Sequence, residues 1–506
     1  MDGCTGIPHL VWYGVNRRNK LNVVRGESQN QPESVRDKEL YKPMKKNKII
    51  VALLLIILAV GISTQLGTGE AVVKDERTKV IVYYVPVTNY FSDRANINAD
   101  DFKTEKAVVL GEDASGVIGL LGAEAIETLD STAALQEKID SGRVAIVRWD
   151  QVGPNLKTLT YNGKLLWKKS DVAEYELKSE ALLPEPEAQK ISFDSSKLTK
   201  INFLGDIMLS RHVNTQMKRL GYDYPWEKVK EITADADITF ANLEVPISDR
   251  YTAPSEGMSF VAPTKNLEYL KLAGIDIVSV ANNHTANFGK QAFLDNLNNL
   301  KGAGINICGG GLTETEARAA TVIKANGLDF NFLCQSAVVG SLYADGEGAG
   351  VPYLGLEPWY RRNQNSLDDL VADIEWARLK EGVVIDSPHW GVEYKHFPNA
   401  DQQAAAKIMI DAGVDLVIGT HPHVVQSLEY YNGKYINYSL GNFIFDQEWS
   451  TATKQGVMAS AYFYQDRNVS VALSPLQIEN YAQPQLVTGT IAKSILSDIE
   501  ESSQGF

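Results

Sequence analysis

A layered α/β fold is predicted for most of this chain, and three observations support that prediction. From residue 200 onward, apolar stretches typical of strands alternate with amphipathic stretches typical of helices. Apolar residues make up 44% of the sequence and charged residues 22%, which is ordinary for a protein with a sizeable core. The length of 506 residues corresponds to roughly two or three domains. We therefore expect an α/β protein with more than one folded unit.

The N-terminal part contains a predicted membrane segment. Residues 49–62 carry no charge, and Lys45, Lys46 and Lys48 directly precede them. Uncharged residues continue to position 68, which brings the segment toward the roughly 17 to 25 residues that a spanning helix needs. We interpret 44–68 as an uncleaved signal anchor, and cleavage at the small-x-small triplet 59–61 is the alternative.

The lysines before this segment predict its orientation. Positive residues stay on the cytoplasmic side, so the folded domains of a single-pass cell-membrane protein would lie on the extracytoplasmic side. Residues 1–43 form a polar extension, and Met44 followed by two lysines is typical of the start of a signal sequence. Our hypothesis is that Met44 is the true initiator.

Residues 78–183 are predicted to form a small α/β domain. Its signals are strands at 80–85 and 144–149 and a helix at 132–139 that Ser131 caps. Through Val152-Gly153-Pro154, Leu159-Thr160-Tyr161-Asn162-Gly163 and Tyr175-Glu176-Leu177, the segment 144–182 resembles the second half of a periplasmic solute-binding domain. A spacer that positions the following domain fits these residues equally well. Two prolines among polar residues then predict a linker at 184–199.

The main domain is expected at 200–480, with a C-terminal tail at 481–506. Its strands are predicted at 201–204, 238–241, 275–280, 305–308, 330–334, 383–386 and 416–418. Its helices are predicted at 265–273, 290–302, 367–380 and 401–412. After residue 439 the pattern changes to short strands, of which 457–464 and 469–473 are the clearest.

Charge and cysteine content exclude some classes of function. A net charge of −14 and a pI near 5.1 disfavour a nucleic-acid partner, because an acidic protein repels a phosphate backbone. Three cysteines are too few for a disulfide framework or a thiolate metal cage. Cys308 and Cys334 lie on predicted strands, where we expect small buried thiols with no chemical role.

Polar motifs follow several of the predicted strands. Four of the seven histidines occur in these motifs: His284, His389, His421 and His423. The carboxylates Asp206 and Glu244 come after two other strands. Because loops at the carboxyl ends of strands converge in an open α/β fold, these side chains are expected to meet. Imidazole and carboxylate ligands without thiolate suit Mn, Fe or Zn in a hydrolytic site.

The same residues carry a family resemblance. Six motifs occur in order: Gly205-Asp206-Ile207-Met208, Asn242-Leu243-Glu244, Asn283-His284, His389-Trp390-Gly391-Val392-Glu393-Tyr394, Gly419-Thr420-His421-Pro422-His423 and Ser439-Leu440-Gly441-Asn442-Phe443. Together they resemble the CapA family of capsule and poly-gamma-glutamate synthesis proteins, which is related to the calcineurin-like metallophosphatases. The resemblance implies a four-layer sandwich of two central sheets flanked by helices.

The resemblance also implies a site with two divalent metal ions. The implied ligands are Asp206, Glu244, Asn283, His389, His421 and His423. His284 resembles the general acid, which would act as an imidazolium. Arg211 is a candidate clamp for an anionic substrate or one half of a surface salt bridge, and Asn442 is a pocket donor or a turn residue.

Two departures from the family pattern concern this site. Met208 stands where ordinary metallophosphatases have a histidine, so one metal position would be weaker or empty. Asn287 stands where relatives commonly have an aspartate, which removes a carboxylate from the surroundings of His284.

These observations predict a membrane-anchored protein that takes part in making, releasing or exporting a cell-envelope polymer. It would carry a metal-dependent hydrolase acting on a phosphoester or anionic polymer. The alternative from another class is a metal-stabilised scaffold among the subunits of an envelope polymer synthase. A soluble nucleotidase is disfavoured by the apolar segment at 49–62.

Overall fold

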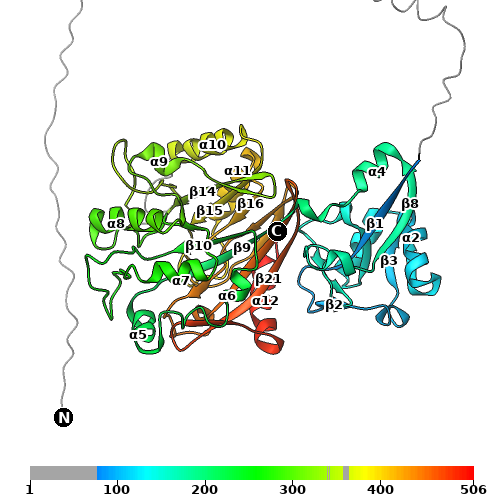
Figure 1. Ribbon diagram of the computed structural model, residues 1–506, viewed down its shortest axis with the longest axis horizontal. Helices are drawn as coiled ribbons and strands as arrows, with labels where there is room; N and C mark the ends of the chain where they lie inside the picture. Colours follow the sequence, from blue (N-terminus) through cyan, green and yellow to red (C-terminus); the bar gives the residue numbers. More distant parts are fainter. Residues whose placement is uncertain (1–76, 339, 341, 357–363) are drawn as a thin grey trace, which may run out of the picture. The chain divides into compact units, whose positions relative to one another are not determined.

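The computed structural model describes residues 77–338, 340, 342–356 and 364–506 (Figure 1). The expected extension at 1–43 and the expected anchor at 44–68 therefore lie outside the described residues. Among the described residues, no helix is long and apolar enough to cross a bilayer. These residues contain two mixed α/β regions, each with its own sheets and its own hydrophobic packing.

The N-terminal region is built on a six-stranded sheet in the order β4-β3-β5-β1-β6, in which β8 also pairs with β1. The expected strands and helix are confirmed, and the helix is capped by the Ser131 Oγ, which accepts from the Ala134 N–H at 3.2 Å. The strands of this region are β1 (Arg77–Thr88), β2 (Asn96–Ile97), β3 (Ala107–Leu110), β4 (Ile126–Leu129), β5 (Ala145–Arg148), β6 (Lys157–Thr158), β7 (Thr160–Tyr161) and β8 (Lys178–Pro184), of which β2 and β7 pair with each other. Its α-helices are α2 (Gly111–Leu121), α3 (Thr132–Asp140) and α4 (Glu185–Ile191).

The linker expected at 184–199 is wrong, because most of that segment is regular structure. Pro184 ends β8, and α4 begins at the next residue. Proline is tolerated in the first turn of a helix, where the missing N–H would have no partner in any case. Ala188 and Ile191 are buried, and the Trp149 indole donates to the Ile191 carbonyl at 2.7 Å.

The larger region contains two sheets. The first has eight strands in the order β12-β11-β10-β9-β20-β21-β22, with β19 paired to β9. The second has six strands in the order β13-β14-β15-β16-β18-β17. The strands of the first sheet are β9 (Leu198–Ile207), β10 (Ile238–Leu243), β11 (Ile277–Ser279), β12 (Asn306–Cys308), β19 (Asn442–Ile444), β20 (Gln455–Tyr464), β21 (Arg467–Glu479) and β22 (Gln483–Leu486). Those of the second are β13 (Thr321–Ala325), β14 (Leu328–Ser336), β15 (Val383–His389), β16 (Leu416–Ile418), β17 (Leu428–Tyr431) and β18 (Lys434–Asn437).

Helices pack on both sides of this pair of sheets. They are α5 (Arg211–Leu220), α6 (Lys230–Thr233), α7 (Asn266–Leu272), α8 (Gly289–Gly302), α9 (Glu314–Arg318), α10 (Gln364–Arg378), α11 (Ala400–Ala412) and α12 (Gly489–Ser503). One core joins side chains of both sheets with α5, α7 and α8, and its Phe240 and Phe332 rings stack across the sheets at 5.7 Å. A separate core packs α10 and α11 against the six-stranded sheet. The layers are helix, sheet, sheet and helix, as Figure 1 lets the reader follow.

Every strand and helix predicted between 200 and 418 is present, with small shifts in its ends. The C-terminal part differs from its prediction. In place of the expected short strands there is the long antiparallel pair β20 and β21. Every residue of β20 is buried, so its sequence lacks the alternation of apolar and polar residues that would indicate the length of the strand. The expected tail at 481–506 is also wrong. It contains β22 and α12, whose Ile495 and Ile499 enter the main core.

The prediction of free thiols at Cys308 and Cys334 is wrong. The two sulfur atoms form a disulfide, with their Cα atoms 5.6 Å apart. Cys308 ends β12 in the first sheet and Cys334 lies in β14 of the second. Their sequence separation of 26 residues hides this proximity, which only the packing of one sheet on the other creates.

Candidate metal centre

The six implied metal ligands meet at the carboxyl ends of parallel strands from both sheets. Asp206 lies near the end of β9, Glu244 follows β10, and Asn283 follows β11. His389 is the last residue of β15, and His421 and His423 follow β16. Parallel neighbours end at the same edge of a sheet, so packing the two sheets face to face brings both sets of strand ends together.

The ligand atoms form two overlapping groups. In each group the atoms lie within 4.8 Å of one another; one contains Asp206, Glu244 and His389, and the other contains Glu244, His421 and His423. Asn283 Oδ1 lies 2.9 Å from His389 Nε2, which adds an amide oxygen to the first group. Glu244 belongs to both groups, so its carboxylate is placed between two possible cation positions.

Buried atoms without partners show that these residues fit a cation. Glu244 Oε2 and His421 Nδ1 are buried and have no hydrogen-bond partner among the described residues. Burial, with Asp206 and Glu393 nearby, raises the pKa of Glu244 well above its usual value. Burial and the neighbouring histidines hold the pKa values of His389 and His421 well below the usual value. A divalent cation binds neutral imidazoles, and it would stabilise the charge of a buried carboxylate that has no cationic partner.

Neighbouring polar side chains hold the ligands in place. Asn242 Nδ2 donates to Asp206 Oδ1 at 2.8 Å and to Glu244 Oε1 at 3.1 Å, and Thr420 Oγ1 lies 3.1 Å from His389 Nδ1. His421 and His423 have φ values of 101° and 58°, in a region that favours glycine. Such backbone conformations persist where the surrounding structure enforces them, typically at functional sites.

Asn442 is not placed to bind a substrate. Its Oδ1 lies 2.9 Å from His423 Nδ1, and its Nδ2 donates to Gln447 Oε1 at 3.1 Å and to the Thr453 carbonyl at 2.8 Å. Only 1% of Asn442 is exposed, and both of its amide groups are engaged. Because the amide oxygen can only accept, it holds the proton of His423 on Nδ1 and leaves Nε2 free for a cation.

The surroundings of His284 oppose the expected imidazolium. Burial, with smaller contributions from His423 and Arg211, lowers the pKa of His284 to about 4, although the hydrogen bond to Asn287 and the charge of Asp206 oppose the shift. His284 Nδ1 lies 3.1 Å from Asn287 Oδ1, which also accepts from the Phe260 N–H at 2.6 Å. The neutral ring therefore carries its proton on Nδ1 and a lone pair on Nε2. This neutral ring must accept a proton at Nε2 before it can donate one from that nitrogen.

Arg211 lies in a buried ion pair, so the surface salt bridge considered from the sequence is wrong. Its Nη2 pairs with Asp446, its Nη1 donates to the Gly257 carbonyl at 2.9 Å, and its Nε has no partner among the described residues. The guanidinium lies over the Phe260 ring at 4.6 Å, and that ring stacks on His284 at 4.1 Å. Asp446 and Phe260 were missed because nothing near them in the sequence marks them as partners of Arg211.

Met208 contributes no nitrogen to the site. Its side chain is completely buried in the main core, and its sulfur lies 3.1 Å from the Ser210 N–H. The position that ordinary metallophosphatases fill with a histidine therefore has a core residue here.

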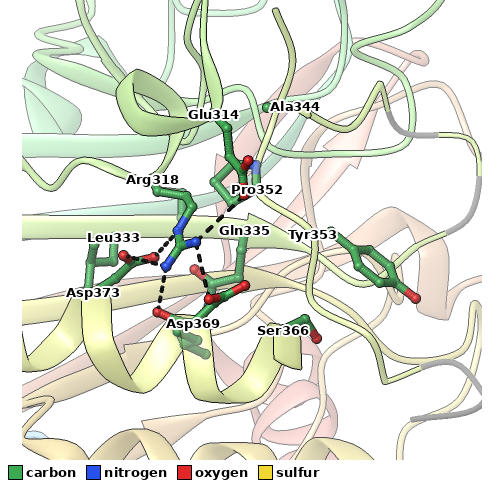
Figure 2. A pocket seen from close by; sticks show the side chains of 12 residues that line it. Glu314, Arg318, Leu333, Gln335, Ala344, Pro352, Tyr353, Ser366, Asp369 and Asp373 are labelled. Atoms are coloured by element: carbon green, nitrogen blue, oxygen red, sulfur yellow. Dashed lines mark hydrogen bonds and ion pairs between the residues drawn. The ribbon is translucent and has the colours of Figure 1, made fainter. Parts of the chain in front are cut away.

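A separate cavity of about 190 Å³ lies beside α9, β14 and α10. Figure 2 shows Arg318 between Glu314, Asp369 and Asp373, and its Nε lies 2.9 Å from Asp373 Oδ2. Three carboxylates surround one guanidinium, so this arginine is not available to bind an anion.

Comparisons with known proteins match the same part of the chain. A family model described as bacterial capsule synthesis protein PGA_cap matches residues 200–447. The capsule biosynthesis protein CapA of Bacillus anthracis is 31% identical over 310 residues, which cover 60% of this chain and 72% of that protein. This chain belongs to the CapA family.

Another CapA relative supports that assignment. The PGA biosynthesis protein CapA of Bacillus subtilis (strain 168) is 27% identical over 328 residues, which cover 63% of this chain and 82% of the relative. Among solved structures, the sulfate thiohydrolase SoxB of Thermus thermophilus is 11% identical, with a TM-score of 0.30 over 52% of this chain and 42% of SoxB. That score is too low to establish a shared fold, so the CapA assignment rests on the family model and the sequence relatives.

Proposed function

We propose that this CapA-family chain is a single-pass cell-membrane protein that acts outside the cytoplasm in the biosynthesis, release or export of a capsule or poly-gamma-glutamate polymer. The family membership and the names of its Bacillus relatives, a capsule biosynthesis protein and a PGA biosynthesis protein, support the role in polymer synthesis. The basic and apolar sequence at 45–62 supports the anchor. Protease added to intact spheroplasts should digest the domains, and protection until lysis would contradict the proposed orientation.

The main domain is proposed to be a metal-dependent hydrolase with two divalent ions, of Mn, Fe or Zn type. The single observation that carries this proposal is the position of Glu244 in two overlapping groups of buried ligand atoms. Bound cations would act as Lewis acids toward a phosphoester or another anionic envelope substrate. The layered arrangement of two sheets between helices agrees with the metallophosphatase relationship that the motifs imply.

The residues of the chain would divide the remaining work. Asn242 and Thr420 hold the ligands Asp206, Glu244 and His389 in position. His284 presents Nε2 as a proton acceptor, and Asn287 keeps that tautomer in place. Arg211 pairs with Asp446 and packs on the Phe260 ring, and it would thereby hold that ring in its stacked position against His284.

A metal-stabilised scaffold for the subunits of an envelope polymer synthase is the second candidate. Two observations favour it: Met208 supplies no ligand, and the low pKa of His284 makes a proton donor at neutral pH costly. A scaffold would need the cations for its structure and would not need proton transfer at His284.

The experiment that tests the hydrolase begins with the full chain. Metal content is measured, and turnover is then assayed with Mn on a panel of phosphoesters. His421→Ala and His423→Ala should each weaken metal binding about 10-fold or more, since removing a residue that only hydrogen-bonds to a ligand already lowers metal affinity roughly 10 to 100-fold. His396→Ala is the matched control, because that imidazole contacts the Val425 carbonyl and is absent from both ligand groups.

His284→Asn separates the two candidates. In a hydrolase this change should lower turnover by about 100 to 10,000-fold, the usual contribution of acid–base catalysis, with metal still bound. Unchanged polymer output from His284→Asn, together with loss of output from Asp206→Ala, would refute the hydrolase and leave the scaffold.

A further inference from the structure

The disulfide between Cys308 and Cys334 joins the two sheets of the main domain. Cys308 belongs to the edge strand β12 of the eight-stranded sheet, and Cys334 belongs to β14 of the six-stranded sheet. The metal centre is likewise divided between the sheets. Asp206, Glu244 and Asn283 come from the first, and the three histidine ligands come from the second. The relative position of the sheets therefore decides whether the two sets of ligands meet.

The disulfide lies one strand away from the place where metal ligands of the two sheets contact each other. Cys308 pairs in register with Ser279 of β11, and its carbonyl accepts from the Val280 N–H at 3.1 Å, just before the loop that carries Asn283. Cys334 pairs in register with Ser387 of β15, two residues before His389. Asn283 follows β11, the neighbour of β12, and His389 ends β15, the neighbour of β14. Asn283 Oδ1 and His389 Nε2 lie 2.9 Å apart, so the two sheets are in contact at these neighbouring strands.

The chain is closely packed around the disulfide. Gly309, which follows Cys308, has a φ of 69°, and a Cβ added there would lie 2.4 Å from the Cys334 carbonyl oxygen and 2.7 Å from Ala281 Cβ. Both cysteines are buried, at 0% and 3% exposure. Cys334 also lines the cavity of about 190 Å³ beside Arg318, drawn in Figure 2, which brings open space to one side of the bond.

We infer that oxidation of Cys308 and Cys334 is a maturation step that completes the metal centre by locking the two sheets in register. The inference rests on the metal site of the proposed function and does not depend on hydrolysis. It also requires the chain to mature in an oxidising compartment, because buried disulfides of this kind form and persist outside the reducing cytoplasm.

The oxidation is a thiol–disulfide exchange with a disulfide donor, either a protein or a small molecule. Two S–H bonds break and one S–S bond forms between Cys308 and Cys334. Two electrons pass to the donor disulfide, which becomes two thiols and takes up the two protons. No other reactant is needed.

The test compares oxidised and reduced forms of the full chain. Wild-type chain is refolded either with glutathione disulfide or with a phosphine reductant, and thiol titration verifies each state. Zn²⁺ and Mn²⁺ affinities are then measured, and circular dichroism reports the fold. The variants are Cys308→Ala/Cys334→Ala and the matched control Cys4→Ala, whose cysteine is not part of the bond.

Reduced chain and the double variant should keep their secondary structure and bind the metal about 10-fold or more weakly, the range expected when support for the ligands is lost. Cys4→Ala should match the oxidised wild type. Wild-type metal affinity in both reduced chain and double variant would overturn the inference, and so would complete unfolding of both, which would show a requirement for folding alone. Free thiols at both positions in chain trapped directly from its native cells would overturn the maturation step. A lack of metal binding by oxidised wild type would instead refute the proposed function.

Discussion

Replacing Asn287 by aspartate tests how the structure controls the proton affinity of His284. In the wild type, Asn287 Oδ1 lies 3.1 Å from His284 Nδ1, and burial lowers the pKa of the imidazole to about 4. Asn287→Asp keeps the acceptor and adds a negative charge in contact with the ring. Opposite charges about 4 Å apart attract by about 4 kcal/mol at an effective dielectric constant near 20, and one pKa unit corresponds to about 1.36 kcal/mol.

Burial of the new carboxylate opposes part of that attraction. The Phe260 N–H, which already donates to position 287 at 2.6 Å, would stabilise the charged carboxylate and limit the loss. We therefore expect the pKa of His284 to rise by about 1 to 3 units. In chain kept free of metal by a chelator, the rise is measured by NMR titration of the imidazole protons, and His284→Gln identifies the resonance among the seven histidines.

Asn98→Asp is the matched control for an added charge. Asn98 Oδ1 accepts from the Asp100 N–H at 2.9 Å in the N-terminal region, and a carboxylate can replace it there. This variant should leave the His284 titration unchanged. A rise below half a unit for Asn287→Asp, or a fall, would show that the contact with position 287 does not govern the proton affinity of the ring.

Two further predictions follow from buried groups. First, the pKa values of His389 and His421 are lowered in the folded chain, so at these two sites the unfolded chain binds more protons, which should reduce the stability of metal-free chain as the pH falls below about 6.5. The raised pKa values of Glu244 and Asp386 act in the opposite direction, so thermal unfolding with chelator between pH 8 and pH 5 is measured in Glu244→Gln/Asp386→Asn, and a midpoint that does not fall in this variant would contradict the burial of neutral imidazoles. Second, Asp446→Asn leaves the buried Arg211 without its anion and should cost about 3 to 5 kcal/mol of unfolding free energy. Glu180→Gln, which breaks the exposed pair with Lys79, should cost at most about 1 kcal/mol, and denaturant unfolding that shows equal losses for both would refute the assignment of Arg211 as a buried partner.

Local sequence was sufficient to predict most strands and the longer helices between 200 and 418, although not α5, α6, α9 or β13, and to identify the residues that gather at the centre of the main domain. The strands predicted between 200 and 418 are short apolar runs, and several of them end at a polar motif that is recognisable in the sequence. Parallel strands end at one edge, so Asp206, Glu244 and the three histidine ligands could be expected to meet. The periodicity of α12 was also available, because Ile491, Ile495 and Ile499 recur every four residues.

Tertiary structure alone decided how these groups behave. The disulfide depends on the packing of two sheets, and the ion pair of Arg211 with Asp446 joins residues 235 positions apart. The engagement of Asn442 and the low pKa of His284 likewise follow from burial and from neighbours on other elements. Residue type and short-range pattern determine which strands and ligands exist, because those are local properties. Proton affinity, partner choice and cross-linking depend on distances between segments remote in the chain, and only the folded chain determines those distances.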